Sequence, residues 1–175
     1  GSSTNQTVPV CWSFIDGGTG YGYVAASNAF SPAKSFYMYD NGDSVNPYIL
    51  VSPETNDLGS GYYRVTFKAR TGTTGTQLIF GTMSNKLDAS TFTALQTFTL
   101  QSNYNADYVM YLPVGTDDYF AFKHGQNGTY VSINIDNVVY EPIPDCPLPI
   151  NLTASPDFNT LTAQLTWAGP SVITN

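Results

Sequence analysis

The sequence holds few residues of the types that carry out acid–base catalysis. Only two glutamates occur, Glu54 and Glu141, and each stands beside a proline at a predicted strand end. A glycoside hydrolase needs two carboxyl groups flanking the scissile bond, and no motif here arranges such a pair. The chain has one histidine, His124, and no G-x-S-x-G motif that would supply a serine nucleophile for it to activate. His124 is therefore interpreted as a polar strand residue. A non-catalytic protein is therefore expected, with a glycoside hydrolase as the least favoured alternative.

Asp136 is the best candidate for a metal ligand. It lies in the run INIDNV that starts at Ile133, where an ionised carboxylate among apolar neighbours needs compensation. A calcium ion, with about six to eight oxygen ligands, would compensate the charge, and Asp16 is the candidate second ligand. Hydrogen bonds from backbone N–H groups would do the same, so both alternatives stay open. The segment Asp40–Asp43 (DNGD) does not fit an EF-hand loop and predicts a turn.

Two groups of side chains are candidates for ligand binding. Tyr62, Arg64 and Lys68 alternate along one predicted strand face, which could stack on an acidic or neutral glycan and donate hydrogen bonds to it. The alternative is a solvated face whose charges discourage aggregation. Tyr21 and Tyr23, which follow a glycine-rich loop, are the second group. They belong to a crowd of tyrosines in the first fifty residues: Tyr21, Tyr23, Tyr37, Tyr39 and Tyr48.

The two cysteines, Cys11 and Cys146, have no metal-type spacing. They flank the main body of the chain, and the ends of a domain often lie close together. A disulfide between them would fasten the start of the domain to its end, and closing so long a loop would stabilise the fold by about 4–5 kcal/mol. Two unpaired thiols are the alternative.

The composition excludes several classes of protein. Charged residues make up 11% of the 175, and the net charge is −7, so the basic surface of a nucleic-acid-binding protein is missing. No apolar run approaches the roughly 20 residues of a membrane-spanning helix, so no direct membrane insertion is expected. Hydrophobic residues make up 42%, enough to bury a core. Low charge with abundant tyrosine is typical of an extracellular or cell-surface protein.

The elements that must position these residues are strands. Residues 62–70 alternate strictly, with Tyr63, Val65, Phe67 and Ala69 on one face. We expect this strand to form a hairpin with residues 76–83, because that pairing keeps both apolar sets on one side. Further strands are predicted over 11–15, 21–26, 36–39, 46–51, 92–100, 106–112, 118–124 and 130–140, with one helical turn at 88–91. This spacing predicts an all-β, antiparallel β-sandwich.

A proline-rich stretch, EPIPDCPLP from Glu141 to Pro149, predicts a domain boundary. We expect residues 1–143 to form the sandwich, 144–149 a linker and 150–175 the beginning of a second β-domain. The last segment is too short to build its own core. Its Leu165 and Trp167 are therefore expected to pack against the first domain or a neighbouring molecule.

Four patches carry a resemblance to a known family: VCWSFID from Val10, NPYILVSP from Asn46, YFAFKH from Tyr119 and INIDNVV from Ile133. Together they resemble the cleaved-adhesin or MAM-like jelly-roll domains of secreted and surface proteins of Bacteroidota. The segments 146–153 and 161–167 resemble the start of a fibronectin type III domain. The resemblance implies a jelly-roll sandwich, and calcium is a structural ligand in several members. The family's acid-rich loop is replaced here, and only Asp16 remains of it.

The sequence thus favours a non-catalytic adhesion or carbohydrate-binding module within a larger surface or secreted protein. Its expected partners are a glycan or a host or cell-surface protein, together with other domains of the parent chain. Calcium is the one expected cofactor. The alternative function is a structural spacer that holds a catalytic domain elsewhere in that chain.

Overall fold

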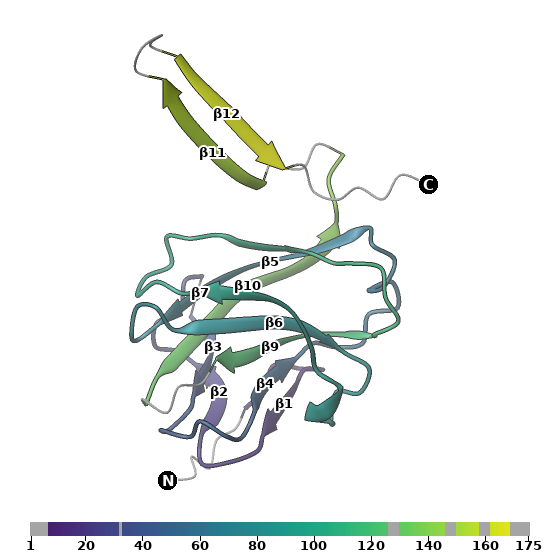
Figure 1. Ribbon diagram of the computed structural model, residues 1–175. Coiled ribbons are helices and arrows are strands. Elements are labelled where there is room, and N and C mark those ends of the chain that lie inside the picture. Colours follow the sequence, from purple (N-terminus) through teal and green to yellow (C-terminus); the bar gives the residue numbers. More distant parts are fainter. Residues whose placement is uncertain (1–6, 32, 126–129, 146–149, 158–161, 169–175) are drawn as a thin grey trace.

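Two five-stranded antiparallel sheets pack face to face, as predicted, and a two-stranded hairpin follows them (Figure 1). The computed structural model describes residues 7–31, 33–125, 130–145, 150–157 and 162–168. One sheet, here the β9 sheet, contains in spatial order β1 (Ser13–Asp16), β4 (Tyr48–Val51), β9 (Tyr119–Gly125), β6 (Gln77–Met83) and β7 (Thr93–Thr99). The other, the β10 sheet, contains β2 (Tyr21–Ala25), β3 (Ser35–Tyr39), β10 (Ser132–Pro142), β5 (Tyr63–Thr71) and β8 (Tyr108–Tyr111).

Aromatic rings from both sheets fill the space between them. Phe67 of β5 meets Phe122 of β9 edge to face, with ring centroids 4.9 Å apart. Phe80 of β6 contacts the same Phe122 ring at 5.2 Å and stacks on Phe120 at 5.9 Å. Such aromatic pairs add about 0.5–1.5 kcal/mol each beyond their buried area. The core therefore holds the two sheets in one fixed relation.

The predicted hairpin between residues 62–70 and 76–83 is wrong. β5 pairs with β10 and β8, whereas β6 pairs with β9 and β7, so the two strands lie in opposite sheets. The turn between them crosses from one sheet to the other, and it is fixed by a 3.0 Å hydrogen bond between the hydroxyls of Thr71 and Thr76. The rings of Phe67 and Phe80 do face each other, but across the core, at 6.3 Å. The apolar pattern is the same in both arrangements, so it could not distinguish them.

The predicted helical turn at 88–91 is present as a short 3-10 helix, η1 (Ala89–Thr91). Asp88 caps it by accepting a 2.9 Å hydrogen bond from the backbone N–H of Ser90. No helix in the described parts of the chain is long and apolar enough to cross a membrane.

The C-terminal segment forms an antiparallel hairpin of β11 (Ile150–Asp157) and β12 (Thr162–Ala168) (Figure 1). Leu165 is 54% exposed, so the expected packing of this residue against the first domain is not observed. The side chain of Trp167 lies outside the described residues, as does the linker segment 146–149. The likeness of this hairpin to a fibronectin type III domain stays a prediction.

Candidate functional site

Four tyrosines form one continuous cluster on the outer face of the β10 sheet. Strands β2 (YGYVA) and β3 (SFYMY) are paired so that Tyr21 lies opposite Tyr39 and Tyr23 lies opposite Tyr37. Because side chains alternate along a strand, these four project outward while the residues between them face the core. We call Tyr21, Tyr23, Tyr37 and Tyr39 the tyrosine face.

The rings of the tyrosine face contact one another in both directions. Tyr21 and Tyr23 stack with centroids 6.1 Å apart, and Tyr37 and Tyr39 stack at 6.2 Å. Across the strands, Tyr21 approaches Tyr39 at 5.4 Å and Tyr23 approaches Tyr37 at 5.4 Å. All four side chains are half-buried, so each keeps part of its ring open to solvent. The sheet thus presents a nearly continuous aromatic surface with little freedom to rearrange.

A close contact beneath the cluster explains the glycine at its centre. Gly22 separates the two tyrosines of β2 and faces the Phe14 ring of β1. A Cβ atom at Gly22 would lie only 2.7 Å from Cζ of Phe14. Glycine therefore lets the edge of the β10 sheet approach the β9 sheet, which fixes the position of β2 and its two outward rings.

Polar side chains of β10 continue the tyrosine face in two rows. Asn134 lies opposite Tyr37 and Ser132 lies opposite Tyr39 in the β3–β10 register. The Asn134 amide donates a 2.9 Å hydrogen bond to the Ser35 hydroxyl, and Ser132 forms a side-chain hydrogen bond with Tyr37. Burial, followed by the neighbouring Tyr21, raises the pKa of Tyr37 to about 12. The phenol is therefore neutral at physiological pH and can both donate and accept hydrogen bonds.

Tyr130 borders the tyrosine face at the Tyr39 end. It is 66% exposed, and its ring covers Gly42, where a Cβ atom would lie 2.8 Å from Cζ of Tyr130. Its backbone neighbour Val131 is held by the buried Asp40, whose carboxylate accepts a 2.7 Å hydrogen bond from the Val131 N–H. The Nε2 atom of His124 lies 3.1 Å from the Val131 carbonyl oxygen. A buried polar cluster thus fixes this end of the surface.

Two loops close the two rows of side chains at the end that lies next to β5. Arg70, opposite Asn134 on β5, donates a 2.9 Å hydrogen bond to the Asn28 side chain and lies over the Tyr104 ring. Tyr104 donates its hydroxyl hydrogen to the Asn28 carbonyl oxygen, and burial raises its pKa to about 12. The segments that carry Asn28 and Tyr104 therefore meet above β5 and limit the open surface to β2, β3 and β10.

The expected basic stripe is engaged within the chain itself. Arg64 binds Glu141 at 2.7 Å, and Lys68 binds Asp107 at 2.7 Å while its ammonium lies over the Phe30 ring. Their side chains are only 18% and 14% exposed. The sequence pattern showed the cations but not the carboxylates and rings that cover them. Tyr62, the third member, lies beside them with 53% of its surface exposed.

The two candidate calcium ligands, Asp136 and Asp16, lie in different sheets of the described structure. Asp136 accepts hydrogen bonds from the N–H groups of Phe30 at 2.7 Å, Ser31 at 3.2 Å and Asn137 at 2.7 Å. These N–H donors stabilise the negative charge on both carboxylate oxygens. Such hydrogen bonds are the alternative to calcium that the sequence left open. Asp16 accepts from the Gly18 N–H at 3.4 Å at the end of β1, in the other sheet. The described residues contain no group of three or more potential metal-binding side chains.

The remaining predicted residues lie away from the tyrosine face. Tyr48 is fully buried and donates a 2.9 Å hydrogen bond to Asp43. Glu54 accepts a hydrogen bond from the Tyr119 hydroxyl at 3.4 Å, whereas Glu141 is paired with Arg64. The two glutamates therefore contact strands of different sheets. Cys11 is exposed, and its predicted partner Cys146 lies outside the described residues, so the disulfide stays a prediction.

Sequence reasoning singled out Tyr21 and Tyr23 but not the residues that complete the surface. The signal was present as a second Y-x-Y pattern in β3, at Tyr37 and Tyr39. Only the β2–β3 register brings the two patterns together. Tyr130 could not have been found this way, because it lies far along the chain from both patterns.

Comparison with known proteins supports the fold. No protein-family model and no curated protein matches the sequence. Among solved structures, the K2 cleaved adhesin domain of Lys-gingipain (Kgp) is similar with a TM-score of 0.59 and 17% identity, over 80% of this chain and 93% of that one. The K1 domain from Porphyromonas gingivalis gives 0.58 and 22%, over 81% and 96%. The CBM22-1 xylan-binding domain from Paenibacillus barcinonensis gives 0.53 and 10%, over 81% and 92%.

Proposed function

We propose that the protein is a non-catalytic, extracellular carbohydrate-binding or adhesion module whose tyrosine face binds a short oligosaccharide. The observation that carries the proposal is the set of four outward rings in two rows, continued by Ser132 and Asn134. Flat rings pack against the apolar faces of sugars, and the phenol groups and the Ser132 hydroxyl supply donors and acceptors that sugar hydroxyls need.

The charges of the surface favour a neutral sugar. The nearest basic groups, Arg70 and Lys68, are held by Asn28, Tyr104 and Asp107. The tyrosine face itself consists of phenol side chains and carries no carboxylate, ammonium or guanidinium group. Recognition would therefore rest on stacking and neutral hydrogen bonds. A xylan-binding domain with the same fold supports this proposal by analogy, although a fold alone does not establish a ligand.

A glycan-array screen in calcium and in chelator tests the proposal. We expect binding to a neutral oligosaccharide in both buffers, because the tyrosine face does not involve the predicted calcium ligands. Tyr23→Ala should weaken the binding of the best glycan at least about tenfold, as expected for a central aromatic contact worth more than about 1.4 kcal/mol. Tyr23→Phe should retain most of the affinity because the ring stays in place.

Tyr62→Ala provides the matched control. This tyrosine is 53% exposed and directly precedes β5, at the end of that strand remote from Arg70. Its removal should leave glycan binding unchanged. The absence of glycan binding in either buffer would refute the proposal and favour a structural spacer. Loss of binding in Tyr62→Ala but not in Tyr23→Ala would move the site to the basic stripe.

A further inference from the structure

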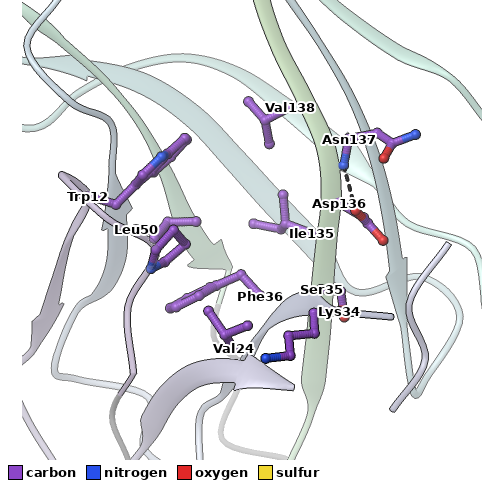
Figure 2. Close-up of a pocket in the computed structure, with 11 residues that line it drawn as sticks. Trp12, Val24, Lys34, Ser35, Phe36, Leu50, Ile135, Asp136, Asn137 and Val138 are labelled. Atoms are coloured by element: carbon purple, nitrogen blue, oxygen red, sulfur yellow. Dashed lines mark hydrogen bonds between the residues drawn. The ribbon is translucent and has the colours of Figure 1, made fainter. Parts of the chain in front are cut away.

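A second surface opens between the two sheets, on the side opposite the tyrosine face. It is a pocket of about 320 Å³. Figure 2 shows apolar side chains from four strands and from the segment before β1 around it. These are Trp12, Val24, Phe36, Leu50, Ile135 and Val138. Pockets of about 300–1,000 Å³ with mainly apolar linings are typical of small-molecule sites.

Irregular backbone borders the pocket on two sides. The pairing of β10 with β5 shifts between Asp136 and Val139, which marks a β-bulge. Asn137 within the bulge has a φ of 48°, and Cys11, which directly precedes Trp12, has a φ of 68°. Bulges and left-handed non-glycine residues occur preferentially at ligand sites, where they redirect side chains.

The bulge separates polar from apolar side chains. Figure 2 shows Asp136 and Asn137 on one side of β10, whereas Ile135 and Val138 project from the other side into the pocket. The Asp136 carboxylate is also occupied by three backbone N–H donors. Asp136 is one of the residues that line the pocket, but these three donors already compensate its charge.

One cation stands at the mouth of this apolar pocket. Lys34 directly precedes β3, and both Lys34 and Phe36 line the pocket. Lys34 is exposed and forms no ion pair with any described carboxylate, in contrast to Arg64 and Lys68. Its charge is therefore available to a ligand.

We propose that this pocket binds a small amphipathic anion, an aromatic ring or short alkyl chain that carries a carboxylate or a similar acidic group. The apolar part lies between Trp12 and Phe36, and the anionic group pairs with Lys34. The site is separate from the tyrosine face, because none of the four tyrosines lines the pocket. It therefore does not depend on the proposed glycan binding.

Tryptophan fluorescence can report this binding directly. The chain has two tryptophans, so in a Trp167→Phe variant all of the tryptophan emission comes from Trp12. The probes are the anionic dye anilinonaphthalene sulfonate and its neutral counterpart N-phenylnaphthylamine. We expect both dyes to quench Trp12. Lys34→Met should weaken binding of the anionic dye about two- to fivefold, the value of one partly exposed ion pair, and leave the neutral dye unchanged.

Two further variants control for net charge and for the place of binding. Lys86→Met removes the same charge from a residue that does not line the pocket, and it should change the binding of neither dye. Val138→Phe should fill the pocket and weaken the binding of both dyes. If Val138→Phe melts at a lower temperature than the wild-type protein, Val24→Phe tests the same point. The proposal is overturned if neither dye quenches Trp12, if Lys34→Met and Lys86→Met behave alike, or if folded filling variants bind both dyes normally.

Discussion

Acid should destabilise this protein through its single histidine. His124 is 1% exposed, and its Nε2 lies 3.1 Å from the Val131 carbonyl oxygen. Burial lowers the pKa of His124 in the folded state, and the charge of Asp40 only partly opposes that shift. In the unfolded chain the imidazole titrates at about 6.5. Below that pH the unfolded state takes up a proton that the folded state resists, so stability falls as pH falls.

The size of the effect follows from one proton. A single group changes the free energy of unfolding by at most about 1.4 kcal/mol per pH unit. Between pH 6.5 and 5.5 the loss is at most about 1 kcal/mol, because the unfolded histidine is still half neutral at the start of that range. A loss of this size lowers Tm by about 2–5 °C in a protein of this length.

Thermal melts at several pH values measure this loss, with His124→Gln as the control. Glutamine can still donate to the Val131 carbonyl oxygen but does not titrate, so its melts should show a smaller decrease over the same range. In the unfolded chain aspartate carboxyl groups titrate at about 3.9, so they act mainly below this pH range. Equal pH slopes for the wild-type protein and His124→Gln would refute the reasoning, and so would a Tm that rises on acidification.

Two other predictions concern the metal and the core. Calcium or a chelator should shift Tm by less than about 1 °C, since a ligand stabilises only what it binds and the charge of Asp136 is already compensated by three N–H donors. A calcium-dependent rise in Tm that disappears in Asp136→Asn would contradict this. Phe80→Ala should cost about 3–5 kcal/mol in urea denaturation, because Phe80 is fully buried and packs on Phe120 and Phe122. A loss below about 1 kcal/mol would show that the site collapses around the missing ring.

The pattern of side chains along single strands could be predicted from the sequence. Val65, Phe67 and Ala69 are all buried, as the strict alternation of residues 62–70 indicates. The helical turn at 88–91 was predicted as well, and the Asp88 side chain that caps it is adjacent in the chain. In both cases the physical cause is local.

The relations between strands could not be predicted in the same way. The pattern in β5 and β6 requires their apolar sides to meet, and it is satisfied both within one sheet and across the core. The same limit affected the basic stripe. Alternation placed Arg64 and Lys68 on one face, but their partners Glu141 and Asp107 are distant in sequence and were brought there by β10 and by a loop.

The geometry of the β10 sheet restricts how the proposed oligosaccharide would lie. The two rows run across the strands from β2 to β10, and strands are spaced by about 4.8 Å. At one end Arg70, Asn28 and Tyr104 form a wall that is held by hydrogen bonds. At the other end β2 is the last strand of the sheet, so the surface is open there. A sugar chain that follows the rows would therefore stop at the wall and leave over β2, which favours the end of a chain over its middle.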